Sequence, residues 1–417
     1  MIKGEQMIKK VSTGQLRPGM YIHDLNCGWM DHPFASKRFK IEDGKTIQKI
    51  AESGIREVYI DTGKGLDVIS APSAEQAAEK READLQKVAE TSAQTRFKES
   101  RISVAEERAK AIAVQNEARE VATALMQDVR LGRQIEVARV EPVVGAMVDS
   151  VFRNKDALIS LGRIREVDQY TFQHSVNLCV LMVAFAKGMG MDHDTINKIG
   201  VGAMLHDIGK MKAPEEILNK PGKLTDEEFN VMRGHVTIGA NVLAESPGLD
   251  PLSIAVAYEH HERWDGTGYP RKLKGDEITV YGQMSAIVDV YDAITSDRCY
   301  HRGMHPTDAL GRILEWSRYH FNPQLTQQFI QCVGIYPVGT VVRLESGRLA
   351  VVVEANEKDM LKPTVRLAYD TKKRDFIAPR DLDLSRTTAT RDRIVGHEDP
   401  HTFGIKVEIL MASKPAA

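Results

Sequence analysis

The most constraining feature of this sequence is a group of histidines inside a region patterned like packed helices. From about residue 135 to residue 332, apolar residues recur at intervals of three and four, as in "VEPVVGAMVDSVF" and "GQMSAIVDVYDAITS". This spacing is typical of helices that share one apolar core. The five histidines of this group are His174, His206, His235, His260 and His261. A fold formed here has to accommodate imidazoles among aliphatic side chains.

A metal centre is the most economical way to bury such a group. One such histidine alone, for example His174, is more often a core residue with a hydrogen-bond partner than a ligand. Five together with Asp207, Asp289 and Asp292 are different, because each unpaired buried polar group costs roughly 1–3 kcal/mol or more. Nitrogen and oxygen ligands without thiolate favour iron(II), manganese or another first-row divalent ion. The number of ligands exceeds what one ion can use, so we expect two divalent ions that share a carboxylate.

The overall composition excludes several other classes of protein. The 56 basic and 58 acidic residues leave a formal net charge of -2, so no overall field would attract a nucleic acid polymer. The four cysteines form no CxxC pair, which argues against a disulfide framework and favours a reducing compartment. The N-terminus has no apolar signal core, and the longest apolar run is shorter than a membrane span. We expect a cytoplasmic protein.

The sequence predicts a multidomain protein whose central part is an all-α helical bundle. The stretch "DGKTIQKIAESG" predicts a helix for which Gly54 suits the C-cap, inside a small α+β module with a regulatory or packing role. The Ala-, Glu- and Lys-rich segment after it predicts a long exposed helix, favoured as a solvated connector over a dimerising coiled coil. Alternating stretches such as "RLAVVVEANE" predict a small antiparallel β module at the C-terminus. The predicted boundaries are 1–70, 71–130, 131–335 and 336–417.

Three motifs in the helical region resemble one known family. "HDIGK", "HHERWDGTGYP" and "DVYDAITSDRCYH" occur in this order, as in the HD-GYP phosphodiesterases, a subgroup of the HD superfamily that hydrolyses the bacterial messenger cyclic di-GMP. The resemblance covers roughly residues 135 to 335. The N-terminal stretch "QLRPGMYIHDL" is similar to a module of unknown role that often precedes HD-GYP domains.

The resemblance assigns a role to each matching residue. Lys210 corresponds to the family lysine that contacts a substrate phosphate, and Arg298 to an arginine on the other side of the dinucleotide. The namesake loop, Gly268, Tyr269 and Pro270, would border the substrate at the mouth of the site and contact partner proteins, such as a diguanylate cyclase. One metal would be held by His174, His206, Asp207 and Asp289, and the other by Asp207, His235, His260 and His261.

Two positions depart from the family pattern. Some members carry a carboxylate one helical turn before the first histidine and hold a third metal there, whereas this chain has Tyr170, which favours two ions. Family members often have Lys or Arg directly after the "RxY" motif, where this chain has His301 followed by Arg302.

The resulting hypothesis is a metal-dependent phosphodiesterase with Asp207 and Lys210 in catalytic roles. A hydroxide bridging two cations would attack phosphorus in line with the leaving 3′ oxygen, opening cyclic di-GMP to pGpG, and a second cut would give GMP. We expect Asp292 to orient a ligand or Lys210, and Glu262 and Asp265 to form ion pairs and turn caps beside Arg263.

Several alternatives remain open at this point. Trp264 either covers the metal pocket, stacks on guanine, or simply packs. The substrate of the hydrolase can be another cyclic dinucleotide or a nucleotide, or the chain can be a non-catalytic messenger sensor. A homodimer through the helical linker is a further possibility.

Overall fold

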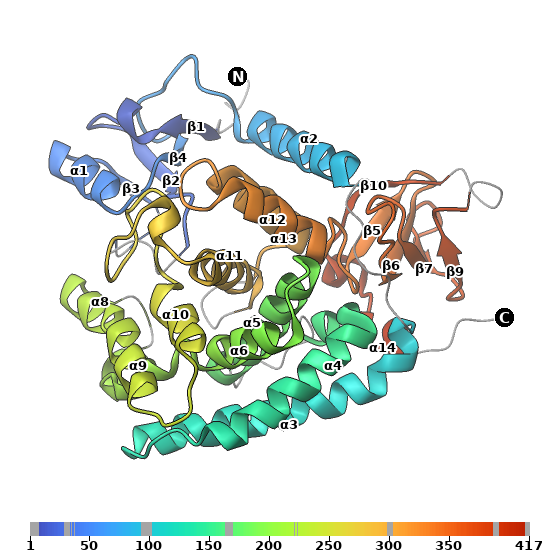
Figure 1. Ribbon diagram of the computed structural model, residues 1–417. Coiled ribbons are helices and arrows are strands. Elements are labelled where there is room, and N and C mark those ends of the chain that lie inside the picture. Colours follow the sequence, from blue (N-terminus) through green and yellow to red (C-terminus); the bar gives the residue numbers. More distant parts are fainter. Residues whose placement is uncertain are drawn as a thin grey trace.

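The computed structural model describes residues 8–28, 34, 36, 38–92, 102–162, 170–220, 222, 224–297, 303–386 and 392–412, apart from the side chains of residues 92, 170 and 171. Helices occupy the middle of the molecule, with one sheet at the N-terminal side and another at the C-terminal side (Figure 1). This agrees with the predicted order of an α+β part, a helical part and a β part. The four domain boundaries stay predictions.

The N-terminal module contains a four-stranded antiparallel sheet and one helix. The strand order is β1-β4-β2-β3, with β1 (Ile8–Ser12), η1 (Thr13–Gln15), β2 (Tyr21–Asp24), β3 (Phe39–Lys40), α1 (Gly44–Glu52) and β4 (Glu57–Asp61). The Asp43 side chain caps α1 by accepting a hydrogen bond from the Thr46 backbone N–H at 2.9 Å. Gly54 follows the helix with a φ of 77°, which confirms the predicted end of this helix.

The helical segment after this module is not a solvated connector. α2 (Ala74–Ser92) packs on α12 (Pro306–Trp316), and α3 (Val104–Arg130) runs along α4 (Val137–Gly162) (Figure 1). The buried positions of α3 include Val104, Ala111, Ala118 and Leu125, which recur every seven residues. The prediction is wrong for α3 because this stripe, although sparse and rich in alanine, allows close approach of a second helix. The face expected to support a homodimer is therefore used inside the chain.

The helical core surrounds the histidine-bearing elements. Besides α4, the chain forms α5 (Tyr170–Gly188), α6 (His193–Leu205), η4 (Ile208–Lys212), α7 (Glu215–Leu218), α8 (Asp226–Arg233), α9 (His235–Ala244), α10 (Pro251–Glu259), η5 (Gly275–Glu277), α11 (Val280–Thr295) and α13 (Pro323–Val333). The capping box at Thr225 and Glu228, expected from the sequence, is present at the start of α8. Within the described part of the chain, no helix is both long enough and apolar enough to cross a bilayer.

The C-terminal part is an antiparallel sheet, as the alternating pattern predicts. Its strand order is β10-β5-β6-β7-β8, and β9 pairs with β7. The elements are β5 (Val341–Leu344), β6 (Arg348–Glu354), β7 (Thr364–Asp370), β8 (Asp375–Phe376), β9 (Asp381–Asp383), β10 (Ile394–His397), η6 (Pro400–Phe403) and α14 (Val407–Ala412). The buried residues of β5, β6 and β7 join the same apolar core as the helices, so this sheet packs against the helical part.

Candidate metal centre

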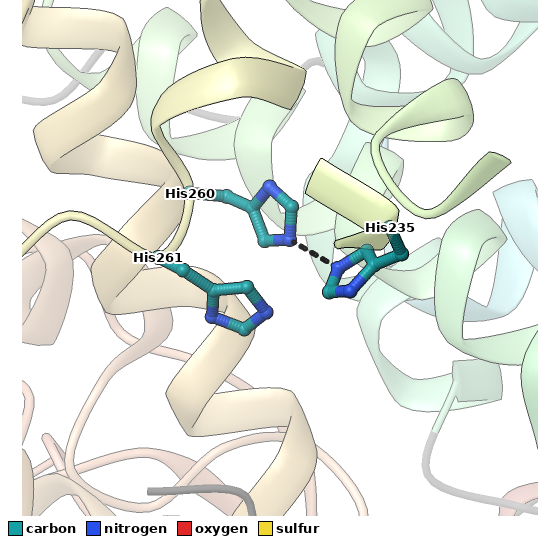
Figure 2. Close-up of side chains that lie close together, drawn as sticks. All are labelled: His235, His260 and His261. Atoms are coloured by element: carbon teal, nitrogen blue, oxygen red, sulfur yellow. Dashed lines mark hydrogen bonds between the residues drawn. The ribbon is translucent and has the colours of Figure 1, made fainter. Parts of the chain in front are cut away.

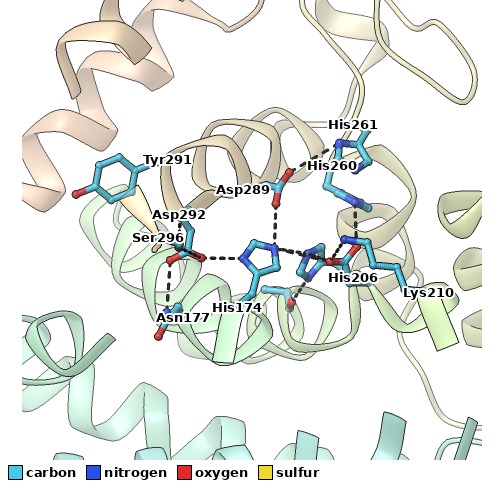
Figure 3. Close-up of polar contacts among 12 residues, drawn as sticks. His174, Asn177, His206, Lys210, His260, His261, Asp289, Tyr291, Asp292 and Ser296 are labelled. Atoms are coloured by element: carbon cyan, nitrogen blue, oxygen red, sulfur yellow. Dashed lines mark hydrogen bonds and ion pairs between the residues drawn. The ribbon is translucent and has the colours of Figure 1, made fainter. Parts of the chain in front are cut away.

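The structure brings together all seven residues predicted as metal ligands. Asp207 follows α6 and His235 begins α9. His174 comes from α5, His206 from the end of α6 and Asp289 from α11, while His260 and His261 follow α10 (Figure 3). Every one of these residues is buried, and none is more than 8% exposed. Segments more than 100 residues apart in sequence therefore share one polar cluster inside an apolar core.

Helix ends set the orientation of three of the histidines. Each places its Nδ1 atom against a carbonyl oxygen three residues earlier, and these pairs are His206–Ala203 (2.8 Å), His235–Met232 (2.6 Å) and His260–Ala257 (2.7 Å). The last carbonyls of a helix lack a donor within the helix, so an imidazole N–H can satisfy them. A carbonyl oxygen can only accept, so Nδ1 carries the proton and Nε2 presents its lone pair to the cluster.

The carboxylate of Asp292 sets the orientation of a fourth histidine, His174. The Nδ1 atom of His174 lies 2.7 Å from Oδ2 of Asp292, whose carboxylate is also contacted by Asn177 (3.4 Å) and Ser296 (3.3 Å) (Figure 3). Asp292 was expected to orient a ligand or Lys210, and its contact is with His174. Its carboxylate keeps Nε2 of His174 directed at the centre of the cluster.

The nitrogen atoms facing one another require a positive charge between them. Nε2 of His174 lies 3.2 Å from Nε2 of His206, and Nε2 of His235 lies 3.5 Å from Nε2 of His260 (Figure 2). Neither ring nitrogen of His261 has a hydrogen-bond partner among the described residues. Converging lone pairs repel unless a proton or a metal cation lies between them, and imidazole and carboxylate ligands suit first-row divalent ions. The residues present therefore fit a metal centre.

Asp207 stands between two groups of ligands. Its Oδ2 atom lies 3.3 Å from Nε2 of His206, and its Oδ1 atom lies 3.2 Å from Nε2 of His235. One oxygen thus faces each side, which is the arrangement that a carboxylate shared by two cations needs. One group with ligand atoms close enough to hold an ion is His174, His206 and Asp207, and another is His235, His260 and His261.

Asp207 and two of the histidines are in the protonation states that metal ligands need, which are an ionised carboxylate and neutral imidazoles. Burial would raise the pKa of Asp207, but the neighbouring His206 and Lys210 hold it well below its usual range. Burial and the charge of neighbouring His206 lower the pKa of His260 to about 3, and burial also lowers that of His261. Burial opposes protonation of His174, but hydrogen bonds to Asp289 and Asp292 outweigh it and raise its pKa to about 9. Without a metal, a proton on His174 supplies part of the positive charge that the cluster needs.

Close packing of η4 against α9 requires the glycine of the "HDIGK" motif, Gly209. A Cβ atom on Gly209 would lie 2.0 Å from the carbonyl oxygen of His235 and 2.5 Å from the backbone nitrogen of Gly239. Only glycine therefore lets η4 approach α9 closely enough to bring His235 next to Asp207. The following Lys210 contacts Oδ2 of Asp207 at 2.5 Å, and its side chain is 17% exposed. It lies where the cluster meets solvent.

The loop after the histidine pair, residues 262–275 and here called the GYP loop, is held by buried carboxylates. Glu262 accepts hydrogen bonds from the backbone N–H groups of Arg271 (2.8 Å) and Leu273 (3.0 Å). The buried Glu259 accepts from the Thr279 backbone and hydroxyl and also contacts Arg271. Sequence reasoning missed Glu259, although an acidic residue directly before a ligand pair in an apolar helix was the available signal.

The GYP loop also contacts the N-terminal module. Asp265 accepts from the Thr267 backbone and hydroxyl, which confirms the expected turn cap. Its arginine partner is Arg56 of the N-terminal module at 3.1 Å, and not Arg263 as expected, because the two segments meet only in the tertiary structure. On the other side of the loop, the Tyr269 ring stacks on His261 with centroids 4.7 Å apart.

Some predicted residues lie outside the described part of the chain. These are Arg298, His301 and Arg302, and the side chain of Tyr170.

Comparison with known proteins gives two family matches and several similar proteins. Residues 154–325 match the HD domain family, and residues 8–140 match a domain of unknown function (DUF3391). A cyclic di-GMP phosphodiesterase of Pseudomonas aeruginosa is 39% identical over 401 residues, covering 96% of this chain and 94% of that protein. A cyclic di-GMP phosphodiesterase of Thermotoga maritima is 37% identical over 184 residues, covering 44% of this chain and 50% of that protein.

Among solved structures, an HD-GYP-type protein of Bdellovibrio bacteriovorus aligns with a TM-score of 0.44 and 17% identity, covering 77% of this chain and 98% of that one. The similarity to the Pseudomonas protein extends over nearly the full length of both chains. This chain belongs to the HD-GYP family of cyclic di-GMP phosphodiesterases.

Proposed function

We propose that this chain hydrolyses cyclic di-GMP to pGpG, to GMP or to both, and that it does so with two divalent cations, iron or manganese. The observation that carries the proposal is the position of Asp207, with one carboxylate oxygen toward each of two groups of inward-facing imidazoles. The near full-length similarity to a cyclic di-GMP phosphodiesterase supports the choice of substrate.

The proposed ligand sets follow the two sides of Asp207. His174, His206 and Asp289 would complete one site, and His235, His260 and His261 the other. Divalent cations at these positions supply positive charge that polarises a phosphodiester and activates water near neutral pH. Asp292 holds His174 in the tautomer that a ligand requires, and the carbonyls at three helix ends do the same for His206, His235 and His260.

Lys210 has the position of a substrate-binding cation. Its ammonium group contacts Asp207 and reaches the solvent-facing edge of the cluster. An anionic phosphate at that edge would compete for Lys210, so we expect its Nζ atom to move from the carboxylate to a phosphate oxygen when substrate binds. Arg298 would contact the other side of the dinucleotide, and Gly268, Tyr269 and Pro270 would border it. The proposed contact of Arg298 rests on its motif alone.

The proposal is tested with full-length protein purified anaerobically, and with the Asp207→Ala variant. Metal content is measured by elemental analysis, and products of cyclic di-GMP, hybrid cyclic GMP-AMP and nucleoside monophosphates are separated by chromatography. We expect about two ions per chain, pGpG or GMP from cyclic di-GMP, and loss of both metal and turnover in the variant. Turnover of the hybrid dinucleotide alone would assign a different substrate.

The sensor alternative predicts a different result for the same variant. If Asp207→Ala loses metal and hydrolysis while its effect on cellular cyclic di-GMP responses persists, the chain acts as a messenger sensor. If metal-loaded wild-type protein leaves cyclic di-GMP intact, the enzymatic proposal is refuted.

A further inference from the structure

A separate cluster of potential metal ligands lies where the C-terminal sheet meets α12. It consists of His305 and Asp308 from the start of α12 and His397 from β10. Each residue offers one ligand atom, and the three atoms lie within 4.8 Å of one another. The cluster shares no residue with the seven ligands of the proposed metal centre, so the proposed hydrolysis gives it no role.

Helix geometry places His305 and Asp308 together. His305 is the N-cap of α12, and Asp308 lies three residues later in the first turn. Side chains at this spacing lie on the same side of a helix, so the imidazole and the carboxylate can face one neighbour. That neighbour is β10, because Nε2 of His397 lies 3.2 Å from Oδ1 of Asp308 although the two residues are 89 positions apart in the sequence.

The two imidazoles lie directly against each other. The ring centroids of His305 and His397 are 3.7 Å apart, and the ring planes differ by 6°. Two imidazolium ions at this distance would repel each other, so at most one of the rings is protonated. The other ring is neutral and has one nitrogen with a lone pair. The cluster thus combines neutral imidazole with a carboxylate that is ionised at neutral pH.

We propose that His305, Asp308 and His397 bind a zinc ion or another first-row divalent cation, which ties the C-terminal sheet to α12. Two imidazoles and a carboxylate form a ligand set that proteins use for zinc, with water in the fourth position. Water can reach the site, because the side chain of Asp308 is 55% exposed and that of His397 is 27% exposed. The inference does not depend on the proposed function.

Binding requires only local adjustment. Nitrogen and oxygen ligands in a tetrahedral zinc site lie about 3.3 Å apart, and the 3.2 Å between His397 and Asp308 already matches this spacing. His305 therefore makes the main movement, by tilting out of the parallel stack. Its Nδ1 atom accepts a hydrogen bond from the Thr307 backbone N–H at 3.3 Å. If Nε2 of His305 binds the ion, a proton moves to Nδ1 and this long, weak bond is lost.

The first test reads the histidines individually in the full-length protein. Diethyl pyrocarbonate reacts with an imidazole nitrogen that has an available lone pair, and peptide mass mapping identifies the modified residue. Zinc at ten times its Kd leaves about a tenth of the sites unoccupied, so we expect modification of His305 and His397 to slow about tenfold. His193, whose side chain is 56% exposed, is the internal control that zinc should not protect. Asp308→Asn keeps both imidazoles and should lose most of the protection at the same zinc concentration.

The second test counts bound ions by equilibrium dialysis against buffered zinc. The proposed metal centre is also expected to take up zinc, so the measured quantity is the difference between variants. At saturation, we expect His397→Gln to hold one ion fewer than wild-type protein. His193→Gln, which removes an exposed imidazole from another part of the chain, should hold as many ions as the wild type.

Equal zinc content in wild-type protein and His397→Gln would overturn the proposal. Equal slowing at His193 and at the two cluster histidines would also overturn it, because zinc would then bind exposed imidazoles in general. Circular dichroism checks that His397→Gln is folded, and Asp308→Asn, at an exposed position, replaces it in the dialysis if it is not. Failure of the wild-type protein to hydrolyse cyclic di-GMP would refute the proposed function and leave both zinc measurements unchanged.

Discussion

The burial of α3 against α4 leads to a prediction about one buried carboxylate. Glu107 of α3 is fully buried, and it accepts two hydrogen bonds from Arg153 of α4 at 2.7 Å each and one from Ser150 at 2.8 Å. Removing either partner of this pair should destabilise the protein, but by different amounts. The difference arises because Arg153 retains 31% exposure while Glu107 has none.

The magnitudes follow from what each change leaves behind. Glu107→Gln removes two charge-assisted hydrogen bonds, worth about 1.5–3 kcal/mol each, but Arg153 regains water, so we expect a net loss of about 2 kcal/mol. Arg153→Met leaves a carboxylate buried without a cation, and breaking a buried pair in this way costs about 3–5 kcal/mol. The double variant has neither the buried carboxylate nor the arginine, so no charge is left without its partner. Its loss of unfolding free energy should therefore be smaller than the sum of the two single losses by at least about 1 kcal/mol.

The assay is urea unfolding followed by tryptophan fluorescence and by circular dichroism, with coincident transitions required. Burial alone would raise the pKa of Glu107, but the hydrogen bonds of Arg153 and Ser150 outweigh it and lower the pKa below 4.5. The contribution of the pair is therefore complete at neutral pH and declines as the pH falls below that value. Losses below about 0.5 kcal/mol in both single variants, adding without coupling, would mean that α3 does not pack on α4.

Three further changes test the site itself. Glu259→Gln replaces a buried acceptor of three hydrogen bonds, and it should lower the free energy of unfolding by about 1–3 kcal/mol in the same urea assay and reduce turnover. Gly209→Ala places a Cβ atom 2.0 Å from the carbonyl oxygen of His235, so we expect a loss of about 3 kcal/mol or more together with lower metal content; Gly44→Ala, which meets no atom within 4 Å, is the control. Asp292→Ala should weaken manganese affinity about 10- to 100-fold in a chelator competition assay, and unchanged affinity would contradict its role in orienting a ligand.

Local patterns in the sequence were sufficient for much of the fold. The helix ending at Gly54, the capping box at Thr225 and Glu228, and the strands β5, β6 and β7 all appear where their patterns indicate. Each of these features depends on residues within one turn or one strand. Backbone geometry and side-chain alternation act over this range, so the sequence alone could predict them.

The helix at residues 104–130 shows that local patterns do not predict which element a helix packs against. Its sparse apolar positions favoured a solvated connector over a coiled coil with a second copy of the chain, whereas in the structure another helix of the same chain covers them. The partner is α4, and the contacts between the two helices include the buried pair of Glu107 and Arg153, which joins residues 46 positions apart. Sequence periodicity carries no information about such a partner.

At the proposed metal centre, too, the sequence determined some features and the tertiary structure determined others. The sequence by itself determined that imidazoles and carboxylates had to meet in an apolar core, because burying them unpaired is too costly. The family motifs implied that Asp207 is shared by both sites, but only the tertiary structure decided that Asp292 faces His174, and that the GYP loop meets the N-terminal module through Arg56. These arrangements are set by how separate helices and loops pack, and packing is a property of the whole chain.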